Sequence, residues 1–401
     1  MCSSIISGLT FGEGYTTTPN LERSAIEKDY VLHLSEYFRQ AGSDPNFRRL
    51  ASRRVASIPK IKKRQNVKQN AGLIYFKKGD MRKDCTTHVD TIKAMGFDGV
   101  VLFYPVHFSG GNSKTYKMPK DPVYGKHYRY EVANRPTTDE FEKCLDHISR
   151  NGLNLNFAPH LESIKTLVSP DESEWRLQSG IPINREYYQT SFSPLIEYLK
   201  KSDNFKDGSL SVTVFSEIDP MVLSAPKASV EVIKNLKIDL RSVKTKRVEI
   251  IYNTNGDFYN GWDLPQAARV SSCHYLKKLL TKVDTIAPSI YGDRGHVSHE
   301  KNSGHATSRV TIKAFKERMN KKLGELCNRQ RYLVRVDDKR IGFGEFALDP
   351  KNKKQSYDVF LRDKSANPSF VNYWNHSEWD HHGITRDISG EKFNRELFES
   401  D

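Results

Sequence analysis

Short apolar runs alternate with amphipathic stretches from about residue 70 to residue 374, and this alternation is what most constrains the fold of the chain. Each run is nearly continuous in aliphatic and aromatic residues, as expected of parallel strands that are buried on both faces. The stretches between the runs repeat apolar residues at helical spacing. The predicted strands cover residues 71–76, 98–104, 153–158, 210–217, 247–252, 283–291, 340–346 and 369–374.

Eight strands with helices between them are typical of an α/β protein built as a (β/α)8 TIM barrel. An open doubly wound sheet is the alternative, but such a sheet normally places a Gly-rich phosphate-binding loop after its first strand. Residues 77–80 (KKGD) form no such loop, and residues 108–112 (FSGGN) lack its glycine spacing. We therefore predict one barrel domain over residues 69–401.

Residues 1–68 are predicted to form a helical N-terminal extension to the barrel. Residues 1–20 are rich in Gly, Ser and Thr, and apolar residues recur at helical spacing over residues 20–40. Between Ser52 and Lys68 there are seven basic residues and no acidic one. This basic segment lacks the interleaved aromatic residues that stack on bases, so it is read as a solvated arm and a nucleic-acid partner is not favoured.

The net charge of +14 gives the chain a field that attracts anions, such as an acidic cell-wall polymer or an anionic membrane surface. No run approaches 18 consecutive apolar residues, so no transmembrane helix is expected. The start Met1-Cys2-Ser3-Ser4 is either an ordinary terminus or what remains of a lipoprotein after signal removal. An extracytoplasmic location is therefore slightly favoured, with membrane contact only if Cys2 carries a lipid.

The five cysteines are widely scattered and form no C-x-x-C pair. This spacing argues against a zinc knot and against a dense disulfide framework. We expect most of them to be buried thiols.

Two of the predicted strands end at a glutamate, Glu217 and Glu345. A carboxylate at the end of a buried strand is costly unless it faces a polar cleft, and strand ends are where such folds place their chemistry. Gly342 and Gly344 remove side chains around Glu345, so that a ligand or another backbone segment can approach. Strands four and seven face each other across a barrel mouth, so the pair suits acid/base and nucleophilic catalysis.

Other polar and aromatic residues follow the predicted strands and are expected to share the same face. His160, in the sequence FAPHLE, is a candidate for binding substrate or orienting a carboxylate. The full ring consists of Lys77, Asp80, Tyr104, His107, His160, Glu162, Glu217, Asp219, Asn253, Asp257, Tyr291, Asp293, Glu345, Trp374, Asn375 and His376.

The order of Glu217, Tyr291, Glu345 and Trp374 resembles the clan of retaining glycoside hydrolases that includes family 5 cellulases and mannanases and family 113 β-mannanases. The resemblance spans residues 70–390 and implies Glu217 as acid/base, Glu345 as nucleophile, Tyr291 as support for the nucleophile and Trp374 as sugar platform. The chain departs from the clan at Ser216, where an Asn that holds the sugar 2-hydroxyl is usual. Because serine is shorter and has one hydroxyl, a 2-amino or 2-acetamido sugar remains open as substrate.

The predicted function is that of a retaining endo-type hydrolase of β-linked polysaccharide, either mannan- or glucan-like or an amino-sugar cell-wall glycan, which needs no cofactor. The predicted substrate-binding residues are Tyr104, His107, His160, Ser216, Asn253, Tyr291 and Trp374. One alternative is an inactive carbohydrate-binding barrel. The other is a metal-dependent hydrolase, because residues 374–382 (WNHSEWDHH) are dense in possible ligands that His107 and His160 could join, although no H-x-H follows the first strand and no H-E-x-x-H occurs. The D-x-x-D-x-D-x-E run of family 18 chitinases is also absent.

Overall fold

The computed structural model describes residues 60–74, 80–109, 129–131, 137–163, 183–243, 245, 247–254, 270–291, 312–347 and 367–373. The chain divides into two compact units, Met1–Ala56 and Ser57–Asp401, and all described residues belong to the second. The predicted N-terminal tail, its helix and Cys2 lie outside the described residues. Among the described residues, no helix combines the length and the apolar character that a membrane crossing requires.

The strands form a closed parallel barrel with eight positions, which confirms the predicted (β/α)8 TIM barrel. Each barrel strand pairs in parallel with its neighbour, and pairing of the first two strands closes the ring, so the open-sheet alternative is excluded. The strands are β1 (Lys68–Ile74), β2 (Gly99–Ser109), β4 (Asn154–Ser163), β5 (Leu210–Ser216), β6 (Glu249–Thr254), β7 (Thr285–Tyr291), β8 (Arg340–Ile341) with β9 (Phe343–Ala347), and β10 (Phe370–Tyr373).

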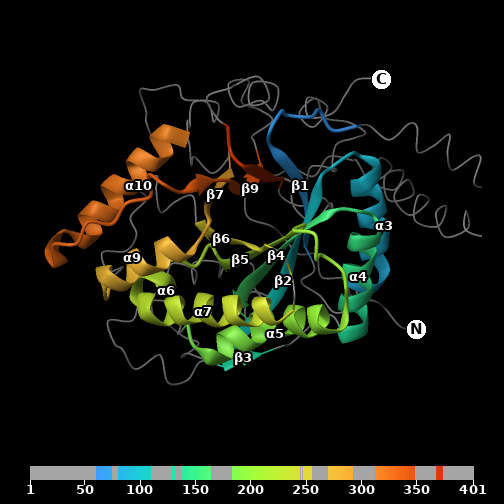
Figure 1. Cartoon of the computed structure of the whole chain (residues 1–401), viewed down its shortest axis with the longest axis horizontal. Coiled ribbons are helices and arrows are strands. Elements are labelled where there is room, and N and C mark those ends of the chain that lie inside the picture. Colours follow the sequence, from blue (N-terminus) through green and yellow to red (C-terminus); the bar gives the residue numbers. More distant parts are fainter. Residues whose placement is uncertain are drawn as a thin grey trace, which may run out of the picture. The chain divides into compact units, whose positions relative to one another are not determined.

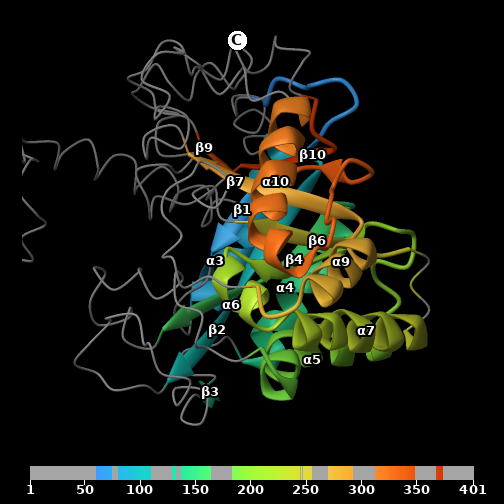
Figure 2. The same ribbon diagram turned by 90° about the vertical axis from the view of Figure 1, so that its left-hand side faces the viewer.

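Two strand features depart from a simple repeat. The seventh barrel position is divided, because Gly342 separates β8 from β9 and both segments pair with β7. The short strand β3 (Arg129–Glu131) pairs antiparallel with the end of β2 and lies beside it in Figures 1 and 2.

The helices surround the strands in chain order, from α3 at the right of Figure 1 through α5 and α7 below to α10 at the left. Helices α5 and α7 run side by side in both views (Figure 2). The short helix α6 begins two residues after Glu217 and was not predicted. The helices are α3 (Asp80–Ala94), α4 (Thr138–Arg150), α5 (Arg185–Lys201), α6 (Asp219–Ser224), α7 (Pro226–Ser242), α9 (Cys273–Lys282), α10 (Ile312–Cys327) and the 3-10 turn η5 (Asn328–Gln330).

Helix α4 shows how the sequence sets these boundaries. The Thr137 side chain accepts a hydrogen bond from the backbone N–H of Glu140, and the Glu140 carboxylate accepts one from the backbone N–H of Thr137. This capping box satisfies N–H groups that the first turn leaves without partners. The helix then buries Phe141, Leu145 and Ile148 against the barrel.

Alternate residues of the strands face two different cores. In β2, Leu102 and Tyr104 belong to the large core between strands and helices, whereas Val101 and Phe103 form a small cluster with Ala158 inside the barrel. A second small cluster inside the barrel consists of Ile251, Ala287 and Phe370. The interior also contains buried polar side chains, namely Asn70, Asn156, Thr213, Ser216, Asn253, Ser289 and Asn372. The site is built on this polar interior.

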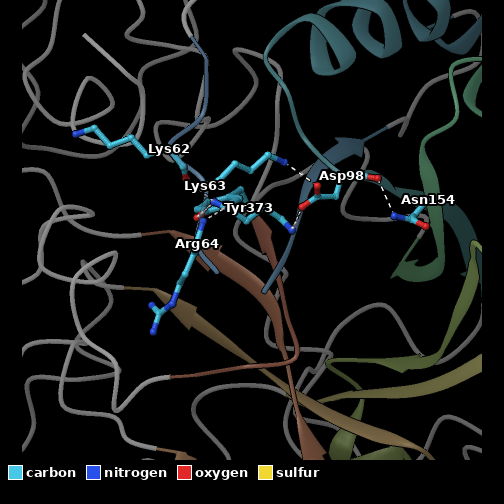
Figure 3. A network of polar contacts seen from close by, with 7 residues as sticks. Lys62, Lys63, Arg64, Asp98, Asn154 and Tyr373 are labelled. Atoms are coloured by element: carbon cyan, nitrogen blue, oxygen red, sulfur yellow. Dashed lines mark hydrogen bonds and ion pairs between the residues drawn. The ribbon is translucent and has the colours of Figure 1, made fainter. Parts of the chain in front are cut away.

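Residues 60–67 are fastened to the barrel by the polar network of Figure 3. The Gln69 side-chain amide donates to the carbonyl of Lys62 at 3.2 Å and to the Tyr373 hydroxyl at 3.0 Å. Asp98 accepts the Gln69 backbone N–H at 2.8 Å and pairs with the Lys63 ammonium at 2.7 Å. The part of the predicted basic segment from residue 60 onward is therefore joined to the first strand.

Two disulfides correct the expectation of buried thiols. Cys85 in α3 pairs with Cys144 in α4, and Cys273 in α9 pairs with Cys327 in α10. Their Cα atoms lie 5.7 Å apart in each case, although 59 and 54 residues separate the partners in sequence. The barrel places consecutive helices next to each other, and this proximity does not show in the cysteine spacing.

Candidate active site

Glu217 is placed by an irregular turn at the end of β5. The β5–β6 register shifts between Thr213 and Phe215, and Glu217 then adopts the left-handed conformation with φ of 55°. Its backbone N–H donates to the Asn253 carbonyl at 3.0 Å, and only 6% of the residue is exposed. Since non-glycine residues rarely adopt positive φ, the surrounding structure must hold this conformation in place.

Glu345 lies within β9 and is 1% exposed. His160, near the end of β4, brings its Nε2 to 3.8 Å from Glu345 Oε1. This distance is too long for a hydrogen bond, so the interaction is electrostatic and attractive when the imidazole is protonated. The His160 ring is held edge-on against Phe103, with ring centroids 5.8 Å apart.

His160, Glu217 and Glu345 come together near the ends of three barrel strands. One side-chain ligand atom from each of the three lies within 4.8 Å of the other two, and all three residues are buried. Paired carboxylates at this separation can divide acid/base and nucleophilic roles. The same three groups can also hold a metal ion, because imidazole and carboxylate are common zinc ligands.

Ser216 and Asn253 form a hydrogen-bonded pair beside Glu217. The Ser216 hydroxyl donates to Asn253 Oδ1 at 2.8 Å. Asn253 Nδ2 donates in turn to the Ala287 carbonyl at 2.8 Å and to the Ser289 hydroxyl at 3.0 Å. Both residues are 2% exposed, so the two predicted substrate-binding side chains are engaged with the protein itself.

Tyr104 does not reach this site, in contrast to the prediction that it binds substrate. It packs in the outer core, with its ring centroid 5.1 Å from Phe141 of α4 and 5.5 Å from Phe157. Asp219 is also buried, and it accepts a hydrogen bond from the Tyr252 hydroxyl of the outer core at 2.6 Å. A continuous apolar run does not reveal which of its residues face the interior, and this explains the error at Tyr104.

The remaining predicted site residues are only partly described. His107, Glu162 and Tyr291 lie on strands β2, β4 and β7, and their side chains are outside the description. Asp80 is the first residue of α3, and its side chain is likewise outside the description. Residues outside the described ranges are Lys77, Asp257, Asp293, Trp374, Asn375 and His376.

Five polar interior residues were missed by sequence reasoning, namely Asn70, Asn156, Thr213, Ser289 and Asn372. Ser289 pairs in register with Glu345. Asn372 donates to the Gly344 carbonyl at 3.1 Å and accepts from Asn70 at 2.9 Å. A lone polar residue within an otherwise largely apolar run was the available signal.

Gly344→Ala is expected to lower the free energy of unfolding by about 2 kcal/mol or more. A Cβ atom at Gly344 would lie 2.2 Å from Asn253 Nδ2 and 2.7 Å from the Ala287 carbonyl oxygen, and the latter is backbone that cannot turn aside. The matched control is Gly324→Ala in α10, where a Cβ atom would meet nothing within 4 Å beyond the backbone of its own helix, and stability should rise slightly. Urea unfolding of both variants measures the difference, and equal stabilities would contradict the packing described here.

Comparison with known proteins finds similarity among solved structures only. No protein-family model and no curated protein sequence matches the chain. Among solved structures, a GH113 β-1,4-mannanase has 13% identity over 82% of this chain and 97% of its own, with a TM-score of 0.45. Thermotoga maritima Cel5A, solved with mannotriose, has 14% identity over 83% and 96%, with a TM-score of 0.40.

A GH18 chitinase from Pseudoalteromonas aurantia is similar to the same extent, with 8% identity over 82% of this chain and 98% of its own and a TM-score of 0.40. At these identities the likeness concerns the fold alone, which the strand pairings establish independently. The chain itself is a (β/α)8 barrel, as its own strand pairings show.

Proposed function

We propose that this chain is a retaining glycoside hydrolase that cleaves β-linked polysaccharide with Glu217 as acid/base and Glu345 as nucleophile. The observation that carries the proposal is the approach of the two carboxylates, whose closest oxygens lie within 4.8 Å of each other. Retaining enzymes hold their carboxyl groups about 5–5.5 Å apart, whereas inverting enzymes need about 6.5–9.5 Å to admit a water molecule. The short approach therefore favours retention.

The reaction follows from the positions of the two groups. Glu345 attacks the anomeric carbon while Glu217 gives its proton to the departing glycosidic oxygen, so one C–O bond forms as another breaks. A water molecule then attacks the same carbon, Glu217 takes its proton, and the bond to Glu345 breaks. The protein ends unchanged, and no cofactor is consumed.

His160 is assigned an electrostatic part in this scheme. Its Nε2 lies 3.8 Å from Glu345 Oε1 in a buried setting, where charge interactions are stronger than in water. A protonated imidazole at this distance would stabilise the carboxylate form of Glu345 that attacks the sugar.

A panel of polymers is used to identify the substrate. The positional resemblance to family 5 and family 113 enzymes makes β-1,4-mannan the first polymer to try, followed by β-glucans. The net charge of +14 adds acidic and amino-sugar cell-wall glycans to the panel. Release of reducing ends identifies the substrate, and NMR of the first-formed anomer identifies retention. Absence of hydrolysis across the panel and across aryl β-glycosides would refute the enzyme proposal, and binding without turnover would instead indicate a carbohydrate-binding barrel.

A metal-dependent hydrolase is the second candidate, because His160, Glu217 and Glu345 present a possible three-ligand set. A chelator distinguishes the two mechanisms. Activity that survives exhaustive chelation supports the two-glutamate mechanism, whereas activity that is lost and then restored by zinc supports the metal enzyme.

Ser216→Ala is expected to reduce kcat/KM by less than about tenfold. The single hydroxyl proton of Ser216 is donated to Asn253 Oδ1, so this residue cannot also donate to the sugar as the asparagine of the related families does. A direct hydrogen bond to the transition state would typically be worth about 10²–10³-fold. Steady-state kinetics on the identified substrate separates these cases, and a loss in the higher range would show that Ser216 contacts the sugar.

A further inference from the structure

We propose that Asn253 is a positioning residue that fixes the orientation of Glu217 against the strand of Glu345 and does not bind the sugar itself. The inference rests on the proposed glycosidase function, and it replaces the substrate-binding role predicted from the position of Asn253 at a strand end. Three sets of contacts carry it.

The first set holds the backbone of Glu217 and its neighbour. The Asn253 carbonyl accepts the Glu217 N–H at 3.0 Å, and Asn253 Oδ1 accepts the Ser216 hydroxyl at 2.8 Å. One residue of β6 therefore accepts hydrogen bonds from two consecutive residues at the end of β5. Because Glu217 has a φ of 55°, which costs an L-residue about 1 kcal/mol or more, these bonds oppose its relaxation to an ordinary extended conformation.

The second set fixes the amide of Asn253. Its Nδ2 donates to the Ala287 carbonyl at 2.8 Å and to the Ser289 hydroxyl at 3.0 Å. A side-chain amide has two N–H donors, so both are used within the protein and none remains for a sugar hydroxyl. The side chain is 2% exposed, in agreement with a role inside the barrel wall.

The third set connects Asn253 to the strand of the second glutamate. Ser289, which accepts from Asn253, pairs in register with Glu345. Gly344, the residue before Glu345, lies so close that a Cβ atom there would be 2.2 Å from Asn253 Nδ2. Asn253 therefore contacts or bonds to the strands of both glutamates. Removing its side chain should change the position of the Glu217 carboxylate relative to that of Glu345.

Crystal structures of Asn253→Ala and of a control, Asn156→Ala, test the placement without reference to activity. Asn156 is equally buried at 2% exposure and accepts from the Thr213 hydroxyl at 3.0 Å, so its loss removes a similar interior contact away from Glu217. Asn253→Ala keeps the backbone carbonyl that accepts the Glu217 N–H but loses the acceptor for Ser216 and the donors to β7, so the Glu217 carboxylate should move, whereas Asn156→Ala should leave it in place. If Asn253→Ala fails to fold, Asn253→Asp keeps the shape and the acceptor for Ser216 but loses both donations to β7, and it should show the shift. An unmoved Glu217 in the Asn253 variant that folds would overturn the proposal.

Kinetics with two aryl β-glycosides of the sugar that the panel identifies give the functional readout. A 2,4-dinitrophenyl leaving group needs little protonation, whereas a phenyl leaving group needs the acid. If Asn253 acts through Glu217, Asn253→Ala should lose about 10²-fold in kcat/KM on the phenyl glycoside and less than about fivefold on the dinitrophenyl glycoside. Asn156→Ala should lose equally on both.

Azide should accelerate turnover of the dinitrophenyl glycoside by the Asn253 variant, because it replaces water without needing a general base. Equal losses on both substrates would refute the positioning role while leaving the glycosidase proposal intact. Wild-type protein that hydrolyses no glycoside would refute the glycosidase proposal, and the structures of the variants would still decide whether Asn253 holds Glu217.

Discussion

Glu345→Gln is expected to abolish turnover, with a fall in kcat of at least about 10⁴-fold, while substrate binding and the fold are kept. Glutamine has the same shape but no negative charge, so it cannot attack the anomeric carbon. Stability should be unchanged or higher, because the substitution removes one of two buried carboxylates that approach within 4.8 Å.

A matched control is Glu249→Gln, at the opposite end of the barrel. Glu249 is the first residue of β6 and pairs with Arg340 at 3.1 Å, far along the strand from Asn253. Its turnover should stay within about twofold of wild type, because an exposed or partly exposed ion pair contributes about 1 kcal/mol or less to stability and none to the chemistry. Kinetics, together with calorimetric titration of oligosaccharide into both variants, separates lost chemistry from lost binding.

A mechanism-based label provides a second measurement of the same prediction. A 2-deoxy-2-fluoro glycoside with a good leaving group should form a stable ester on the nucleophile, and peptide mass spectrometry should place it on Glu345. A label on another residue, or more than about 1% residual turnover in Glu345→Gln, would contradict the assignment.

The barrel could be predicted because continuous apolar runs and capped amphipathic stretches are local properties of the sequence. The boundaries shifted by a few residues: the run predicted at 153–158 became β4, Asn154–Ser163. The approach of Glu217 and Glu345 was also accessible, since each ends an apolar run and barrel topology brings the ends of parallel strands to one face.

The orientation of individual side chains could not be predicted in the same way. Tyr104 belongs to the outer core because of its position in the pleat of β2, and a run such as DGVVLFY carries no polar alternation that would reveal it. The positive φ of Glu217 was equally hidden, because glutamate has no preference for that conformation. Its backbone N–H donates to the carbonyl of Asn253, a residue on the next strand.

Loss of the two disulfides is expected to lower stability strongly. Each closes a loop of more than 50 residues, with separations of 59 and 54, and joins consecutive helices of the barrel. By chain entropy, closing loops of this length contributes about 4 kcal/mol per bridge. Typical domains are stable by about 5–15 kcal/mol, so the paired variants Cys85→Ala/Cys144→Ala and Cys273→Ala/Cys327→Ala should each unfold at a clearly lower temperature, by roughly 5–10 °C.

Thiol counting decides whether the bridges exist in the purified protein, which should be produced in an oxidising compartment because disulfides persist there. Of five cysteines, four are paired, so the denatured, non-reduced chain should expose one thiol and the reduced chain five. Five thiols without reductant would contradict both bridges. A third variant replaces all four paired cysteines with alanine. If reduction lowers the melting temperature of wild type but leaves that of this four-alanine variant unchanged, the stabilisation comes from the bridges and not from the packing of the sulfur atoms.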